Sequence, residues 1–73
     1  MKIGICVPHY GRPIETERIY ELVLRAEELR LDSVWVTDHV TVPRDTALIY
    51  REDMLDPLAM LPWLAGVTDR IAL

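Results

Sequence analysis

An amphipathic stretch at residues 15–30 lies between two short apolar runs, and this order constrains the fold more than any other feature of the chain. The first run, residues 2–7, is nearly all apolar and stops at Pro8, and the second run, residues 33–36, reads SVWV. Continuous apolar runs of this length are typical of strands buried on both faces of a parallel sheet. Strand, helix and strand in this order predict a right-handed βαβ unit.

The amphipathic stretch predicts a helix over residues 15–30. Its apolar residues recur at helical spacing on one face: Ile19, Leu22, Val23, Ala26 and Leu29. Glu21 and Arg25 form an i,i+4 pair in the favourable orientation, which is a minor stabilising contribution. No glycine stands where this helix ends, so the sequence predicts backbone strain at Arg30 or Leu31.

The rest of the chain predicts a loop, a second helix and the start of a third strand. Residues 40–53 have no clear period, and loops of this length are often functional. Asp56, followed by a proline, is a typical helix start, and we expect a helix to about residue 69 with a bend at Pro62. Residues 71–73 resemble the first residues of a strand. The order β-α-β-loop-α-β predicts a parallel sheet, and we expect the chain to be the first part of a longer protein.

Composition excludes several classes of protein. The 73 residues are 51% hydrophobic and carry a net charge of −4, and the arginines are scattered among acidic residues, so we expect no nucleic-acid partner. The longest uncharged run, residues 57–68, is too short to span a bilayer, and we expect no membrane partner. Cys6 is the single cysteine, which fits a soluble protein of the reducing cytoplasm. We expect Cys6, Trp35 and Trp63 to be buried in the core.

Asp38 and His39 follow the second predicted strand directly. Active sites of parallel α/β proteins gather at the carboxyl ends of the strands, and an imidazole exchanges a proton near neutral pH. The pair is therefore a candidate for proton transfer or for contact with a cofactor. The structural alternative is an aspartate that caps the turn and a histidine that packs under the loop.

His9 follows the first strand in the segment PHYG. One reading places His9 with Asp38 and His39 in a metal site, but no ligand spacing such as H-x-H or H-x-x-E-H occurs, and we predict no metal. The other reading places His9 at the mouth of the site or packed in the loop. The loop after the first strand also lacks the glycine patterns of dinucleotide-binding and P-loop proteins.

Four segments together resemble the N-terminal part of the bacterial luciferase-like flavin monooxygenase superfamily: KIGICVPHYGRP, RAEEL, DSVWVTDH and DPLAMLPWLAGVTDRIAL. The pattern is most similar to the branch that uses the deazaflavin coenzyme F420. The resemblance implies an α/β fold of the TIM (β/α)₈ barrel type, of which residues 1–73 would be only the first β-α-β-loop-α-β portion. Such a portion is about a quarter of a typical barrel of ~250 residues or more, and alone it should be inactive.

The resemblance also implies a function. Coenzyme F420 as first choice, or FMN, would bind at the carboxyl face of the strands. His39 would act beside the ring as proton donor or acceptor, and Asp38 would orient it or contact the cofactor. The reaction would be hydride transfer with the deazaflavin, or oxygen insertion with reduced flavin, on a small organic substrate. Relatives are usually dimeric, so the full-length protein is expected to be a homodimer.

The sequence departs from the family pattern at three positions, and it also allows two other functions. Relatives usually carry glycine and an aromatic residue where this chain has Arg30 and Leu31, and a small helix former at Pro62. The first rival is a non-catalytic α/β interaction module whose apolar second helix docks a partner. The second is a metal-dependent hydrolase barrel that uses His9, Asp38 and His39.

Overall fold

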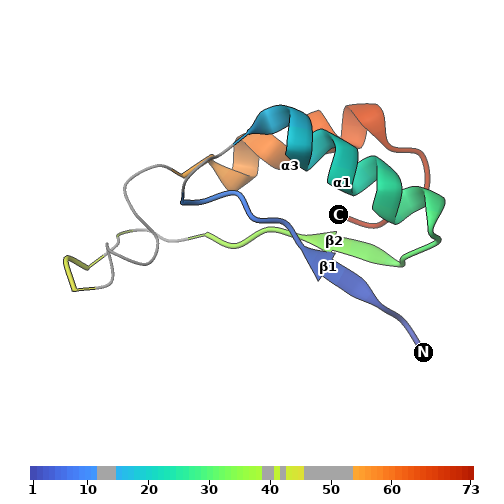
Figure 1. Cartoon of the computed structure of the whole chain (residues 1–73), viewed down its shortest axis with the longest axis horizontal. Coiled ribbons are helices and arrows are strands. Elements are labelled where there is room, and N and C mark those ends of the chain that lie inside the picture. Colours follow the sequence, from blue (N-terminus) through green and yellow to red (C-terminus); the bar gives the residue numbers. More distant parts are fainter. Residues whose placement is uncertain (12–14, 39–40, 42, 46–53) are drawn as a thin grey trace.

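The protein is described by a computed structural model, which shows a small α/β unit (Figure 1). The described residues are 1–11, 15–38, 41, 43–45 and 54–73. Two parallel strands, β1 (Gly4–Cys6) and β2 (Ser33–Trp35), form the sheet. Two helices, α1 (Thr16–Glu28) and α3 (Pro57–Val67), both lie on one side of it. The predicted α/β class is thus confirmed. Most of the predicted 40–53 loop lies outside the described residues.

Residues at the C-terminal end of the chain extend the sheet beyond β2. The Val34 amide donates to the Ala72 carbonyl at 2.8 Å, and the Ala72 amide donates to the Asp32 carbonyl at 3.1 Å. Ser33 therefore has a parallel partner on each side, Gly4 in β1 and Ala72 beyond α3. The predicted third strand is present as this single bridge, and β2 is central.

The core lies between the sheet and the two helices. Alternate residues of each strand point toward the helices, as the pleat of a strand requires. The apolar face of α1 and part of α3 cover them (Figure 1). Among the described residues, the buried side chains of this core are those of Val7, Ile19, Val23, Ala26, Val34, Met60, Leu64 and Ile71.

Helix α1 ends in a hydrogen-bonded turn that places one non-glycine residue in a left-handed conformation. The Leu31 amide donates to the Ala26 carbonyl and the Arg30 amide donates to the Glu27 carbonyl, each at 3.0 Å, which is the Schellman pattern. Arg30 has a φ of 63°, so the predicted strain falls on this residue.

The predicted ion pair of α1 differs in the structure. Arg25 pairs with Glu28 at 3.0 Å and not with Glu21. A partner one turn later was available at i,i+3, and both charged groups are mostly exposed, so the choice changes the stability little.

Glu27 ties α1 to the turn between α3 and the third strand. One of its carboxylate oxygens, Oε1, accepts from the amides of Asp69 at 2.9 Å, Arg70 at 2.6 Å and Ile71 at 3.0 Å. The amide of Arg70, followed by that of Ile71, holds the pKa of Glu27 below its usual value of 4.5, because these hydrogen bonds favour the ionised form. Arg70 completes the tie through Nη2, which donates to the carbonyls of Glu27 and Leu31.

Helix α3 begins where the sequence predicts. The Asp56 carboxylate accepts from the Ala59 amide at 2.9 Å as N-cap, and Pro57 occupies the first turn. The helix continues through Pro62 and ends at Val67, two residues before the predicted end. In the described part of the chain, no helix has the length and apolarity needed to cross a membrane.

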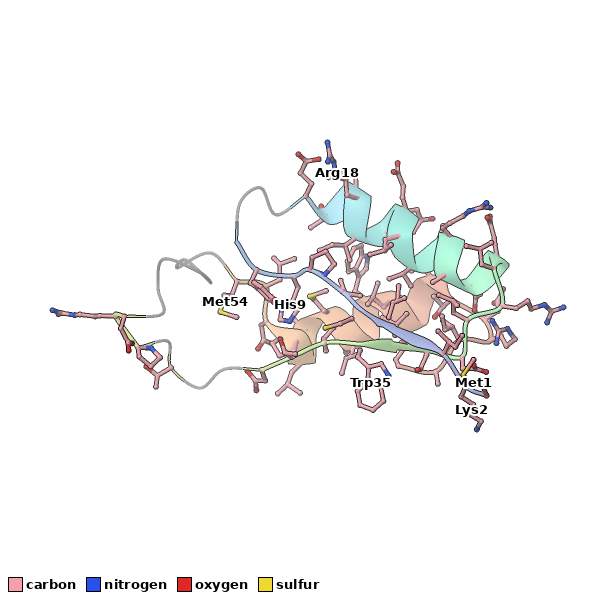
Figure 2. The ribbon with its side chains drawn as sticks, turned by 60° about the horizontal axis from the view of Figure 1, so that its bottom comes forward. Met1, Lys2, His9, Arg18, Trp35 and Met54 are labelled. Atoms are coloured by element: carbon pink, nitrogen blue, oxygen red, sulfur yellow. The ribbon has the colours of Figure 1, made fainter. Side chains whose placement is uncertain are left out.

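Three residues expected in the core are not buried. Trp35 is 65% exposed, Trp63 is 36% exposed and Cys6 is exposed. The sequence pattern predicts strands covered on both faces, but both helices lie on one face, so Trp35 and Cys6 stand on the uncovered one. Figure 2 shows the Trp35 side chain pointing away from the helices.

On the uncovered face, one edge of the exposed Trp35 indole lies against Ser33 and Gly4. The indole Nε1 donates to Ser33 Oγ at 2.9 Å along the same strand. Gly4, opposite Ser33, leaves room for this pair, since a β-carbon at Gly4 would lie 3.0 Å from Trp35 Nε1 and closer still to Ser33 Oγ. A glycine is needed here for space.

Candidate functional site

The carboxyl ends of β1 and β2 lie side by side and carry the candidate site. The ladder continues past the strands, with the Val7 amide donating to the Trp35 carbonyl at 2.8 Å. Thr37 and Asp38 follow on the β2 side, and both are exposed. Asp38 therefore lies at the strand end, where the sequence predicts it. His39 lies outside the described residues.

His9 is the buried polar residue at these strand ends, with 0% of its surface exposed. Its Nδ1 lies 3.0 Å from the Leu55 carbonyl oxygen, across 46 residues of sequence. Its Nε2 lies 3.1 Å from the Thr37 amide nitrogen and 3.2 Å from Thr37 Oγ1. Figure 2 shows His9 close to Met54, whose neighbour Leu55 it contacts.

The partners of His9 determine its tautomer. A backbone amide only donates, so Nε2 must accept from Thr37 and carries no proton. A carbonyl only accepts, so Nδ1 must carry the proton and donate to Leu55. His9 is therefore a neutral imidazole protonated on Nδ1, with both nitrogens satisfied.

The segment before α3 joins the same site through the backbone. The Leu55 amide donates to the His9 carbonyl at 2.9 Å, and Tyr10 and Met54 form an antiparallel bridge. The rings of His9 and Tyr10 meet edge to face, with centroids 5.6 Å apart. Three segments far apart in sequence thus meet around one imidazole.

This arrangement offers an exposed carboxylate on a fixed strand end. Asp38 can accept hydrogen bonds from a ligand's N–H or O–H groups, while the hydroxyl of the exposed Thr37 is engaged with His9. His9 offers no free lone pair to a metal, because Nε2 accepts from Thr37 and Nδ1 is protonated. In the described ranges, no three His, Cys, Asp or Glu side chains gather as a metal site.

Sequence reasoning missed the role of His9 as a tie. Ile5, Val7 and His9 alternate along β1 and the extended residues that follow it, and this period of two places His9 on the helix-facing side with Val7. A histidine on a buried face needs hydrogen-bond partners, so the alternation was a usable signal. Glu27 carried no comparable signal, since its partners are backbone amides more than 40 residues away.

A groove lies on the surface apart from the strand ends. It is an open groove of about 330 Å³ between α1 and α3, lined by Thr16, Glu17, Tyr20, Glu21 and Trp63. None of these residues belongs to the candidate site, and none was predicted to be functional.

Comparison with models of known protein families, with curated proteins and with solved structures finds no match. The candidate site therefore depends on the position of Asp38 at the end of β2, on the tie made by His9 and on the resemblance of the sequence. The roles of Asp38 and His39 stay predictions.

Proposed function

We propose that this chain is the N-terminal part of a luciferase-like (β/α)₈ oxidoreductase that uses coenzyme F420 or FMN. The observation that carries the proposal is the winding of the sheet. The strand order is β1, β2 and then the bridge at Ala72, all parallel, with α1 and α3 on the same face. A barrel begins in this way, because each helix returns over the outside of the sheet.

The uncovered face of the sheet supports the same proposal. In a (β/α)₈ barrel the inner face is filled by layers of side chains from the strands. Trp35 with its close neighbours Gly4 and Ser33 has the composition of such a layer, one large side chain between small ones. The remaining strands of a barrel would cover it.

Asp38 and His39 are the residues to which we assign the chemistry. The Asp38 carboxylate, exposed at the strand end, suits hydrogen bonds to N–H or hydroxyl groups of a coenzyme. His39 would hold or move a proton beside the bound ring. The coenzyme would supply hydride transfer, or oxygen insertion in the case of FMN. The substrate would be a small organic molecule, and the full-length protein a cytoplasmic homodimer.

Coenzyme titration tests the proposal. We expect the full-length protein to quench F420 or FMN fluorescence in a saturable way, and Asp38→Asn to weaken binding. Replacing His39 by alanine should lower turnover by about a hundredfold or more with the fold intact, as for loss of a general acid or base. The control is Asp45→Asn, which changes an exposed carboxylate outside the strand end. No saturable binding of either coenzyme would reject the proposal.

A second candidate is a non-catalytic interaction module. It is favoured by the outer side of α3, a helix without charged residues whose Leu58 is 73% exposed. A chain that folds cooperatively, stays monodisperse and binds neither coenzyme would support this module over the oxidoreductase.

A further inference from the structure

We infer that His9 is a positioning residue, which sets the direction of the Asp38 carboxylate by holding the amide of Thr37. This inference rests on the proposed function, because the site that His9 would position is the one proposed above. His9 itself touches neither coenzyme nor substrate, since it is fully buried.

The chain leaves β2 through a residue that the His9 ring holds. Among the described residues, the ladder between the strands ends with the bond from Val7 to Trp35. Two residues later, the Thr37 amide is held by the His9 ring at 3.1 Å. The Thr37 hydroxyl also lies 3.2 Å from Nε2, so the ring holds both the backbone and the side chain of the residue directly before Asp38.

The opposite side of the ring contacts the segment before α3. Nδ1 donates to the Leu55 carbonyl, one residue before the N-cap Asp56. The same imidazole therefore sets the distance between the end of β2 and the start of α3. A site placed between these two segments would change its width if the ring were lost.

Two substitutions at His9, by asparagine and by glutamine, test the Leu55 side and the Thr37 side of the ring separately. The side-chain NH₂ of asparagine reaches the position of Nδ1, so His9→Asn keeps a donor for Leu55 and leaves the Thr37 amide without its acceptor. The side-chain oxygen of glutamine reaches the position of Nε2, so His9→Gln keeps the acceptor for Thr37. His9→Gln loses the bond to the Leu55 carbonyl, and His9→Asn loses the acceptor shared by the Thr37 amide and hydroxyl, so we expect both variants to lose thermal stability.

The first arm of the test measures coenzyme binding by the full-length protein. We expect His9→Asn to raise the dissociation constant about tenfold, which corresponds to one misplaced hydrogen bond, and His9→Gln to stay within about threefold. Equal weakening in both variants would mean that His9 is only structural, and would overturn the inference. Arg25→Ala, an exposed change on α1, is the control.

The second arm does not depend on the function. Both substitutions remove the imidazole ring and therefore shift the nearby amide signals, so the ¹⁵N spectra are compared for amide-proton exchange. The Thr37 amide proton should exchange faster with solvent in His9→Asn than in His9→Gln, because only asparagine leaves it without an acceptor. Equal exchange in the two variants would overturn the inference even if coenzyme binds. If neither coenzyme binds the unaltered protein, the proposed function fails while these exchange rates still decide the role of His9.

If the His9 variants do not fold, a measurement on the unaltered protein still tests the inference. The imidazole nitrogen signals of His9 should identify a neutral ring protonated on Nδ1, the form that Thr37 and Leu55 require. A ring protonated on Nε2 cannot accept from the Thr37 amide, so finding it would overturn the inference without any substitution.

Discussion

His9 and Glu27 are single side chains that each join segments distant in sequence, but they do so in opposite charge states. His9 is buried and neutral, and it has one donor and one acceptor for two segments. Glu27 is ionised, and a single oxygen accepts from three successive amides. The charge of Glu27 therefore links folding to pH.

The contribution of Glu27 should be lost in acid. Its pKa is lowered in the folded chain, so the stabilisation is fully present above the ordinary value of 4.5 and disappears as the pH falls through the lowered folded value. Glu27→Gln should lower the free energy of unfolding at neutral pH and flatten its decrease in acid, as measured by urea denaturation across pH. Glu28→Gln, a neighbour in an exposed ion pair, should change stability by less than about 0.5 kcal/mol. Equal effects at both positions would contradict the tie.

Gly4 and Gly66 should respond in opposite directions to the same substitution. Gly4→Ala forces a methyl group against Ser33 and Trp35, and we expect it to lower the free energy of unfolding by about 1–3 kcal/mol. Gly66 lies inside α3 with open space around it, so Gly66→Ala should raise stability by about 0.5–1 kcal/mol. Urea denaturation of the two variants measures both. A neutral Gly4→Ala would mean that Trp35 moves away without cost.

At the scale of the element, sequence reasoning worked best where one residue has a local role. Asp56 was predicted correctly as the N-cap, and the strain falls on Arg30, one of the two residues for which it was predicted. Capping and left-handed conformations depend on neighbours a few residues away. Helix ends differed by up to two residues. The ion pair of Arg25 was wrong, because several carboxylates compete for an exposed guanidinium at similar energy.

Replacing Arg30 by glycine should stabilise the chain by about 1 kcal/mol, because glycine adopts a left-handed conformation without the clash of a β-carbon. Arg25→Gly is the matched control, and inside α1 it should cost about 1 kcal/mol. In thermal denaturation, the midpoint temperature should rise for Arg30→Gly and fall for Arg25→Gly. A destabilised Arg30→Gly would show that the arginine side chain itself contributes to the turn.

The N-cap of α3 should also contribute measurably to the stability of the chain. Asp56→Ala removes the acceptor of the Ala59 amide and should lower stability by about 1 kcal/mol. Asp56→Asn retains a side-chain oxygen and should stay close to the original. The comparison by chemical denaturation separates the hydrogen bond from the general effect of substitution, and equal losses would contradict a capping role.

At the scale of the whole molecule, the sequence predicted the order of elements and the parallel sheet. The structure agrees with both, including the parallel bridge between Ser33 and Ala72. The sequence also predicted strands covered on both faces, and here it failed for Cys6 and Trp35. An apolar pattern records that a residue favours burial, and it does not record which partner buries it. Of the candidate site, the place of Asp38 was predictable, while the contacts of His9 depend on packing between segments 28 and 46 residues apart.

The exposed indole of Trp35 makes the uncovered sheet face observable by light. An indole in water emits at longer wavelength than one in an apolar environment, so whatever comes to lie on this face should shift the Trp35 emission toward the blue. Trp63 stands on a helix at the other side of the sheet, and Trp63→Phe would leave Trp35 as the only indole. The emission of Trp35 thus reports directly on whatever packs against the uncovered face of the sheet.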